Sequence, residues 1–211
     1  MTDTLDTLFG ILRGRRSIRR FDARPVDPAL LDRVLDAAQW APSAGNRQAY
    51  RFIVVTSAGA ISAMGEAVEH ARARISEGLR EDLSGEISAY MGNFTHFSLA
   101  PVVVVPIYRP GVDLLEAAAE GEGRARAKRP SDVDALSSVC AAIMCLLLAA
   151  DAAGLGACWM TGPLVANDAL REAAQVPDGW EIAAVIPVGH PAETPDAPLR
   201  RPLSRLVRRI T

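Results

Sequence analysis

Apolar side chains recur at helical spacing near the start of the chain. Residues 5–14 form a short periodic segment that ends at a glycine, a residue that often follows the last turn of a helix. Further on, Asp27 can accept from free first-turn amides, and Pro28 suits the first helical position. Apolar residues then recur at positions 31, 34, 35 and 38. These patterns predict one helix over 5–14 and another from 28 to about 41.

Short apolar runs predict the strands. They cover residues 50–56, 101–108, 157–160 and 181–188. Prolines in the second run favour strand ends, so we expect a buried strand there. Residues 61–90 are charged and helical in pattern, and a further helix is expected over 167–174.

A long helix is predicted in the second half of the chain. Ser131 and Asp134 form a start similar to a capping box. Residues 139–150 are apolar on nearly every face, so this helix should run through the core until Gly154 and Gly156 end it. The preceding residues, 111–130, are charged and rich in alanine and glycine. They are compatible equally with a mobile lid and with a plain solvated loop.

Composition supports a single α+β domain over residues 1–211. The chain is 49% hydrophobic and 23% charged, with neither an internal repeat nor a linker. A net charge of -2 gives no overall attraction to nucleic acid or to an anionic membrane. The three cysteines have no metal-ligand spacing and indicate reduced core residues. Without a signal peptide or an apolar run long enough to span a bilayer, we expect a cytoplasmic protein without a metal site.

Arginines crowd both ends of the chain, and the sequence Arg15-Arg-Ser-Ile-Arg-Arg-Phe21 is the densest group. Guanidinium groups match phosphate oxygens, and a hydroxyl adds a neutral donor. In an extended segment Arg15, Ser17 and Arg19 would face one side together and could line one ligand. A solvated basic stretch is an equally good interpretation of these residues alone.

Two further segments could carry chemistry. Residues 41–48 form a small-residue loop whose serine, asparagine and glutamine can donate and accept hydrogen bonds. Residues 154–163 lead from a helix end through a short apolar run into a tight turn. Each segment alone is explained as well by a structural turn or a helix stop.

Together, the order and spacing of these segments resemble the nitroreductase family of FMN-binding α+β dimers. The resemblance covers nearly the whole chain. Its matching elements are Arg15-Arg-Ser-Ile-Arg-Arg-Phe21, Pro42-Ser-Ala-Gly-Asn-Arg-Gln48, Gly154-Leu-Gly-Ala-Cys-Trp-Met-Thr-Gly162, Ile186-Pro-Val-Gly-His190 and Arg200-Arg-Pro-Leu203. The resemblance implies a nitroreductase-like fold, with a central and mostly antiparallel sheet flanked by helices in a homodimer.

The same resemblance implies how the phosphate end of FMN would be held. Arg15, Arg16 and Ser17 would contact the phosphate and the ribityl chain, joined by Arg200 or Arg201 from the tail. Arg19 would lie near the pyrimidine side of the flavin, where a fixed cation favours the reduced form.

It also implies contacts to the flavin ring. Pro42, Ser43, Asn46 and Gln48 would hold the ring edge and ribityl hydroxyls from the neighbouring subunit. The ring would pass Met160, Thr161 and Gly162, with a backbone N–H of Thr161 or Gly162 near the flavin N5.

The implied activity is a ping-pong reduction in which NADH or NADPH reduces FMN and a nitroaromatic, quinone or similar small acceptor then reoxidises it. No protein acid or base would be essential. Alternatives are dehydrogenation, dehalogenation or oxygen-dependent chemistry on the same fold, or a non-catalytic flavin-binding module. His96 could line the substrate pocket or serve only structure, and Trp40 and Trp159 are expected in the core.

Overall fold

The computed structural model describes residues 3–111, 117–127 and 133–210. Its helices are α1 (Thr4–Gly14), α2 (Pro28–Ala38), α3 (Ala58–Glu77), α4 (Ser84–Met91), α6 (Gly121–Ala127), α7 (Val133–Ala152) and α8 (Asn167–Ala173). Short 3-10 segments are η1 (Ala44–Asn46), η2 (Glu81–Leu83), η3 (Gly92–Leu99), η4 (Gly162–Ala166) and η5 (Leu203–Arg205). The strands are β1 (Tyr50–Val55), β2 (Val102–Tyr108), β3 (Gly156–Ala157), β4 (Glu181–Ile182) and β5 (Ile186–Gly189).

The strands form one antiparallel sheet in the order β1-β2-β5-β3, with β4 also paired to β2. All seven residues of β2 are buried, because helices cover both faces of the sheet. Successive side chains of β2 point to opposite faces, so Val102 and Val104 join one core cluster and Val103 and Val105 join the other. The predicted α+β fold with a mostly antiparallel sheet is confirmed.

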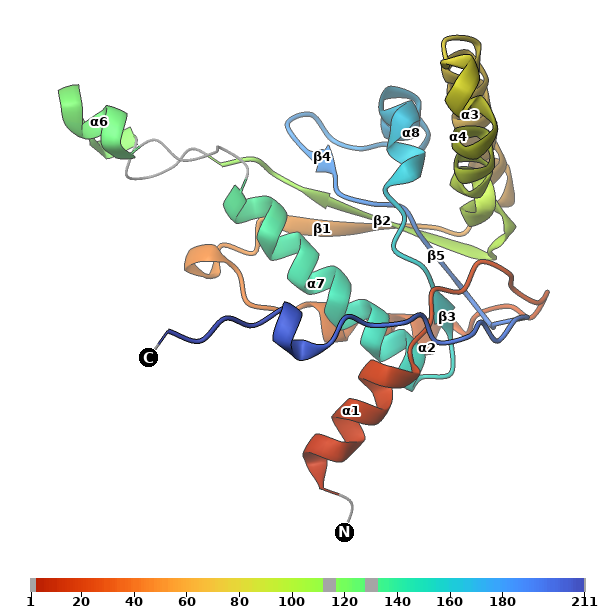
Figure 1. Cartoon of the computed structure of the whole chain (residues 1–211), viewed down its shortest axis with the longest axis horizontal. Helices are drawn as coiled ribbons and strands as arrows, with labels where there is room; N and C mark the ends of the chain where they lie inside the picture. The colour runs from red at the N-terminus through yellow and green to blue at the C-terminus, as the bar shows by residue number, and fades with distance from the viewer. Residues whose placement is uncertain (1–2, 112–116, 128–132, 211) are drawn as a thin grey trace.

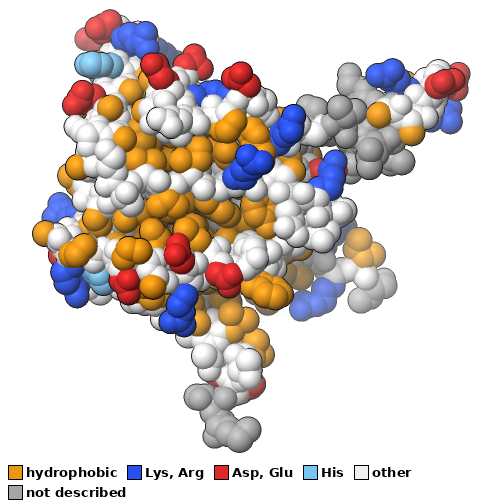
Figure 2. All heavy atoms as spheres, turned by 180° about the vertical axis from the view of Figure 1, so that it is seen from behind, with side chains coloured by type: hydrophobic (Ala, Val, Ile, Leu, Met, Phe, Trp, Pro, Cys, Tyr) orange, Lys and Arg blue, Asp and Glu red, His pale blue; other side chains and the backbone are white. Residues whose placement is uncertain are grey.

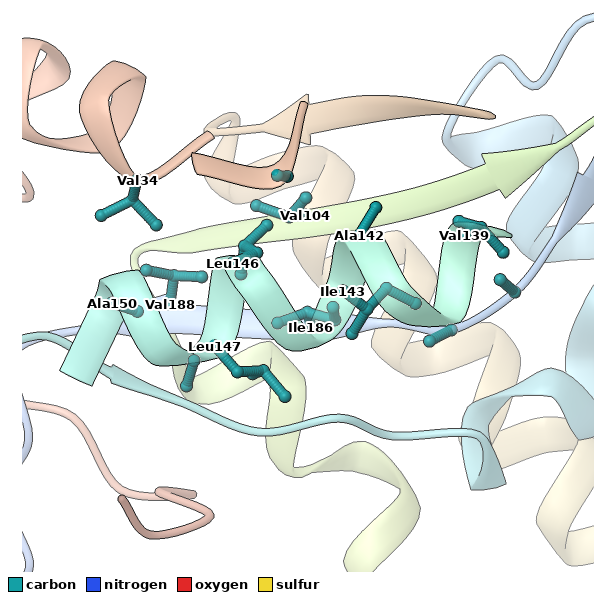
Figure 3. Packing of buried hydrophobic residues seen from close by; sticks show 14 of the residues in the cluster. Val34, Val104, Val139, Ala142, Ile143, Leu146, Leu147, Ala150, Ile186 and Val188 are labelled. Atoms are coloured by element: carbon teal, nitrogen blue, oxygen red, sulfur yellow. The ribbon is translucent and has the colours of Figure 1, made fainter. Parts of the chain in front are cut away.

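Helix α7 forms the centre of the first core cluster. Figure 3 shows Val139, Ile143, Leu146 and other α7 side chains packed against Val104 of β2 and residues of β5. By length and composition α7 could cross a membrane, yet its buried apolar residues belong to this core. The second cluster joins the other face of the sheet to α3, η3 and α8.

The start of α2 follows the sequence closely. Asp27 accepts a hydrogen bond from the Ala29 amide at 3.0 Å, and Pro28 is the first residue of α2. The predicted capping role of Ser131 lies outside the described residues. Of the segment 111–130, the structure describes residue 111 and residues 117–127. These contain α6, which extends away from the body of the molecule in Figure 1.

Three predicted elements differ from the structure. The helical pattern over 61–90 divides into α3 and α4 because α3 ends at Gly78. The short strand expected over 157–160 is β3, which covers Gly156–Ala157, followed by an isolated bridge from Met160 to Val185. The strand expected over 181–188 divides into β4 and β5.

The division between β4 and β5 has a cause in β2. Val104 faces Ile186, and Ile107 faces Ile182. The chain from β4 to β5 therefore has one more residue between these two pairs than β2 has. Pro106 lies at this point and has no N–H to donate, while its carbonyl accepts from the Ala183 amide at 2.9 Å. The resulting bulge frees Val185 to exchange backbone hydrogen bonds with Met160, which supports the segment after β3.

Candidate functional site

Residues 15–21, the arginine segment, lie beside β3. The Ile18 amide donates to the Ala157 carbonyl at 3.1 Å, and Ser17 forms a parallel bridge with Ala157. A Cβ on Gly156 would be only 2.8 Å from the Ile18 side chain, so glycine permits this close approach. The arginine segment is therefore fixed to the edge of the sheet rather than freely solvated.

The predicted alternation of this segment is visible in its neighbours. Arg16 and Ile18 line one hollow together with Asp151 and Pro195, whereas Arg19 lines a different pocket. Ile18 is buried and Ser17 is half-buried beside Cys158. The segment thus presents Ser17 and Arg19 away from the surface on which Arg16 and Ile18 lie.

Arg16 uses its donors on the main chain. Its Nη1 donates to the carbonyl oxygens of Arg13, Gly14 and Arg15 at 2.6, 2.9 and 2.9 Å, and its Nε donates to Pro195 at 3.2 Å. A guanidinium at this position satisfies carbonyls at the C-terminal end of α1. Arg16 therefore ties α1 to the C-terminal part of the chain.

Arg15 differs from Arg16 in having a buried donor without a partner. Its Nε is buried and makes no hydrogen bond with any residue that the structure describes. Buried polar groups are normally paired, because an unpaired donor costs about 1–3 kcal/mol. An anionic ligand at this point would supply the missing acceptor. Arg15 therefore fits a phosphate better than Arg16 does.

Arg19 lies in a pocket of about 410 Å³ beside the segment that follows β3. Its lining residues are Arg19, Tyr90, Asn93, Phe94, Cys158, Trp159, Met160, Thr161, Gly162 and Pro163. Four predicted cofactor residues, Arg19 and the run Met160–Gly162, are thus brought together from distant parts of the sequence.

Phe94 lines this pocket in direct contact with Gly162. A Cβ on Gly162 would lie 2.3 Å from Phe94 Cδ1, so the ring packs directly on the glycine backbone. Tyr90 meets Phe94 edge to face, with ring centroids 5.2 Å apart at 85°. Tyr90, Asn93 and Phe94 line this pocket although no sequence signal marked them. His96 of the same segment, the predicted candidate, does not line it, and its buried Nδ1 has no hydrogen-bond partner among the described residues.

Another hollow of about 420 Å³ lies between α3 and η3. Glu66 and Glu69 line it together with several hydroxyl groups. Two carboxylates would repel a phosphate, whereas Arg19 would attract one. Charge therefore favours the pocket beside β3 for an anionic cofactor.

Cys158 lies beneath the arginine segment and is only 2% exposed. Burial raises the pKa of its thiol, while Arg19, Arg15 and a hydrogen bond with Ser17 oppose the rise. The thiol therefore stays protonated at neutral pH, as expected for a small core residue.

The loop at 42–48 has an unusual backbone. Gly45, Asn46 and Gln48 all have positive φ, at 58°, 51° and 46°. Ser43 Oγ accepts from the Gln48 amide at 3.1 Å, and Asn46 Oδ1 accepts from the Gln48 side chain at 3.0 Å. Left-handed non-glycine residues are costly and tend to occur at functional sites.

This loop is attached to the opposite end of α7 from the arginine segment. The Ala44 amide donates to Ser138 Oγ at 3.2 Å, while a Cβ on Gly14 would be 3.9 Å from Asp151 Oδ2. The helical rise from Ser138 to Asp151 is about 20 Å. Figure 1 shows η1 and the arginine segment at opposite ends of α7. Within one chain the structure does not bring these two predicted parts of the site together.

The structure gives the two predicted tail arginines no partner of their own. Arg200 and Arg201 are exposed, and among the described residues neither has a hydrogen-bond or ion-pair partner. Trp40, expected in the core, is 79% exposed at the end of α2, whereas Trp159 is partly buried. The prediction for Trp40 was wrong, because a lone tryptophan carries no signal for what covers it.

Comparison with known proteins identifies the fold and the family. The family model described as "Nitroreductase family" matches residues 12–190. YfhC of Bacillus subtilis, provisionally named an NAD(P)H nitroreductase, is 30% identical over 92% of this chain and 89% of its own. A 5,6-dimethylbenzimidazole synthase of Rhodospirillum rubrum is 31% identical over 90% of this chain and 83% of its own.

Two solved structures share the fold over the full length of both chains. A BluB-like flavoprotein from Clostridium difficile has a TM-score of 0.81 at 21% identity. A nitroreductase from Desulfitobacterium hafniense, solved with bound FMN, has a TM-score of 0.72 at 20% identity. With the family model matched over most of its length, this chain belongs to the nitroreductase family.

Proposed function

We propose that the protein is an FMN-dependent oxidoreductase that transfers electrons from NADH or NADPH to a small organic acceptor. The observation that carries this proposal is the buried Nε of Arg15, which has no partner among the described residues, in the same segment as Arg19, which lines a pocket with the run Met160–Gly162. A cationic segment and a pocket with aromatic lining residues match the two ends of FMN, a phosphate and a planar ring. When bound, FMN would supply hydride acceptance and donation.

The residues would divide the work of binding. Arg15 would donate to the phosphate, with Ser17 adding a hydroxyl donor near the ribityl chain. Arg19 would put a positive charge beside the pyrimidine side of the ring, and a backbone N–H of Thr161 or Gly162 would face its N5. Arg16 would contribute through the C-terminal end of α1, since its Nε and Nη1 already donate to carbonyls.

The positions of the predicted parts support a homodimeric site. Pro42, Ser43, Asn46 and Gln48 lie at the far end of α7 from Arg15, so a site that uses both takes this loop from a second copy. In such a dimer Arg200 or Arg201, which are exposed in the single chain, would contact the FMN phosphate.

Exposed apolar surface also supports a second copy. Helix α1 has no buried residue, and its apolar side chains at 5, 8, 9 and 12 form one stripe exposed between 39% and 53%. Figure 2 shows hydrophobic side chains gathered across the middle of one face of the molecule. Exposed apolar surface of this extent is typical of interfaces.

Spectroscopy tests the cofactor and the electron donor together. Purified protein reconstituted with FMN should retain it through gel filtration and should bleach on anaerobic addition of NADH or NADPH. A nitroaromatic or a quinone should then restore the oxidised spectrum. Retained FMN that neither nicotinamide bleaches would contradict the reductase proposal and favour a flavin-binding module.

A matched pair of variants tests the phosphate contact. Arg15→Ala should weaken FMN binding by about tenfold or more, because a charge-assisted bond to the phosphate is lost. Arg20→Ala removes an exposed guanidinium from the same segment and should bind FMN as the wild type does. Equal binding by both variants would contradict the assignment of Arg15.

A second candidate function is oxygen-dependent conversion of the flavin itself. It is favoured by the 31% identity to a 5,6-dimethylbenzimidazole synthase and by the fold of the BluB-like flavoprotein. Reduced FMN incubated with the protein in air would then yield 5,6-dimethylbenzimidazole, detectable by chromatography and mass spectrometry. Oxidised FMN as the sole product would exclude this candidate.

A further inference from the structure

The chain immediately after β5 runs back along the arginine segment. We call residues 190–196 the return segment. The Asp22 amide donates to the His190 carbonyl, and the Ala192 amide donates to the Arg20 carbonyl, both at 3.0 Å. Phe21 and Pro191 form an antiparallel bridge. Backbone contacts therefore hold the two segments in a defined register, although they are far apart in the sequence.

Glu193 makes a different kind of contact within this pairing. Its Oε1 accepts from the Arg19 amide at 2.6 Å and from the Arg20 amide at 3.1 Å. One carboxylate oxygen thus receives two successive backbone N–H groups, an arrangement that concentrates positive dipole ends on an anion. Because the acceptor is charged, these bonds are stronger than those between neutral groups.

Arg19, whose backbone amide Glu193 binds, also lines the candidate cofactor pocket. Arg19 lines the pocket beside Met160 and Thr161, while its backbone is bound by Glu193 from outside the pocket. The charges of Arg19 and Glu193 both act on the buried Cys158 thiol, in opposite directions. Burial is the main cause of its raised pKa, to which Glu193 adds and which Arg19 opposes.

We propose that Glu193 is a positioning residue that fixes the backbone of Arg19, so that the Arg19 guanidinium is held at the edge of the cofactor pocket. The inference extends the proposed FMN site and depends on it. Glu193 does not touch the cofactor in this arrangement. Glu193 instead lowers the conformational freedom of the Arg19 side chain, which would touch the cofactor. Less entropy is therefore lost when FMN binds. Glu193 also partly offsets the positive charge of Arg19.

The first test is a double-mutant cycle on FMN affinity, measured by quenching of FMN fluorescence. Glu193→Ala should weaken binding about tenfold, and Glu193→Gln, which keeps an amide oxygen as acceptor, about threefold. In an Arg19→Ala background, Glu193→Ala should add less than about a twofold effect, because the side chain that Glu193 positions is absent. Asp196→Asn is the matched control. It removes an exposed carboxylate from the return segment and should leave the affinity unchanged.

The outcomes separate this inference from the proposed function. Wild-type protein that binds no FMN would overturn both. If the wild type binds FMN and Glu193→Ala binds it with the same affinity, only the role of Glu193 is overturned. The same follows if Glu193→Ala lowers the FMN affinity equally with and without the Arg19 side chain. Circular dichroism identifies any failure of Glu193→Ala to fold, in which case Glu193→Gln decides by the same cycle.

The flavin midpoint potential gives a second readout that a purely structural residue would not move. Glu193→Gln should shift the potential to a more positive value, because the charge of Arg19 is then less compensated near the reduced flavin. Asp196→Asn should leave it unchanged. A potential equal to that of the wild type in Glu193→Gln would contradict the electrostatic part of the proposal.

Discussion

At the scale of single residues, glycines decide how closely the parts of the pocket approach. Gly162 packs against the Phe94 ring and Gly156 against Ile18, in both cases nearer than a Cβ would allow. Neither glycine has a positive φ, so space rather than backbone conformation requires the missing side chain. Substitutions at these positions therefore test packing directly.

Gly162→Ala should destabilise the protein by about 1–3 kcal/mol, because its methyl group would overlap the Phe94 ring. Urea unfolding measures the change. Gly85→Ala is the control: that glycine lies within α4 with nothing within 4 Å of the added Cβ, so it should stabilise the protein slightly. Phe94→Ala in the Gly162→Ala protein should relieve the overlap, and an additive loss would argue against it.

Burial of Cys158 predicts how its thiol responds to pH. Burial raises its pKa above the ordinary 9.0, so the folded state holds the proton more tightly than the unfolded state does. This contribution to stability is complete below pH 9 and is lost as pH rises above it. The pKa values of Tyr50 and Cys140 are also raised by burial and act in the same direction.

We therefore expect the free energy of unfolding to fall with rising pH above about 9, and less steeply in Cys158→Ala. At pH 8 iodoacetamide should alkylate Cys158 slowly in the native protein and rapidly in urea, as followed by peptide mass spectrometry. Rapid native alkylation would show that the thiol is accessible.

At the scale of elements, α1 is an amphipathic helix that contacts α7 but whose apolar stripe is left uncovered by the described residues. Its exposed stripe includes Leu8 and Phe9, and only its C-terminal end is tied down, by Arg16. A short helix is marginal in water unless packing stabilises it, so a second copy is the expected cover.

Leu8→Lys should weaken the proposed dimer by about tenfold or more, because a charge would enter the proposed apolar interface. Sedimentation velocity over a range of concentrations measures the change. Thr7→Lys adds the same charge on the adjacent residue of α1, outside the apolar stripe, and should leave the association intact. Dissociation by both variants would point to a general charge effect.

At the scale of the whole molecule, the arrangement along α7 makes a prediction about shared sites. Arg15→Ala damages the arginine segment, whereas the double variant Asn46→Ala, Gln48→Ala damages the loop. If each site takes these parts from different subunits, a mixed dimer has one wild-type site and one doubly damaged site. Mixing the two weakly binding proteins and exchanging their subunits should then restore wild-type affinity at about a quarter of the FMN sites. No restoration would place both parts in one subunit.

Local patterns in the sequence determined a large part of this fold. The start of α2, the apolar faces of α7 and the buried run of β2 follow from periodicity and capping, which depend on near neighbours. The alternation of Arg16, Ile18 and Arg19 likewise needs only an extended backbone. The order of the motifs was enough to indicate the family.

Tertiary packing decided the rest, because it depends on contacts between residues far apart in the chain. Pro106 and the bulge opposite it divide the strand predicted over 181–188, and Gly78 ends a helix whose pattern runs on. The contacts of Phe94 with Gly162 and of Glu193 with Arg19 join segments that share no sequence signal. Charge and periodicity identified Arg15 and Arg16 alike, and only the folded chain distinguishes them. Arg16 donates to carbonyls at the end of α1, whereas the buried Nε of Arg15 has no acceptor among the described residues.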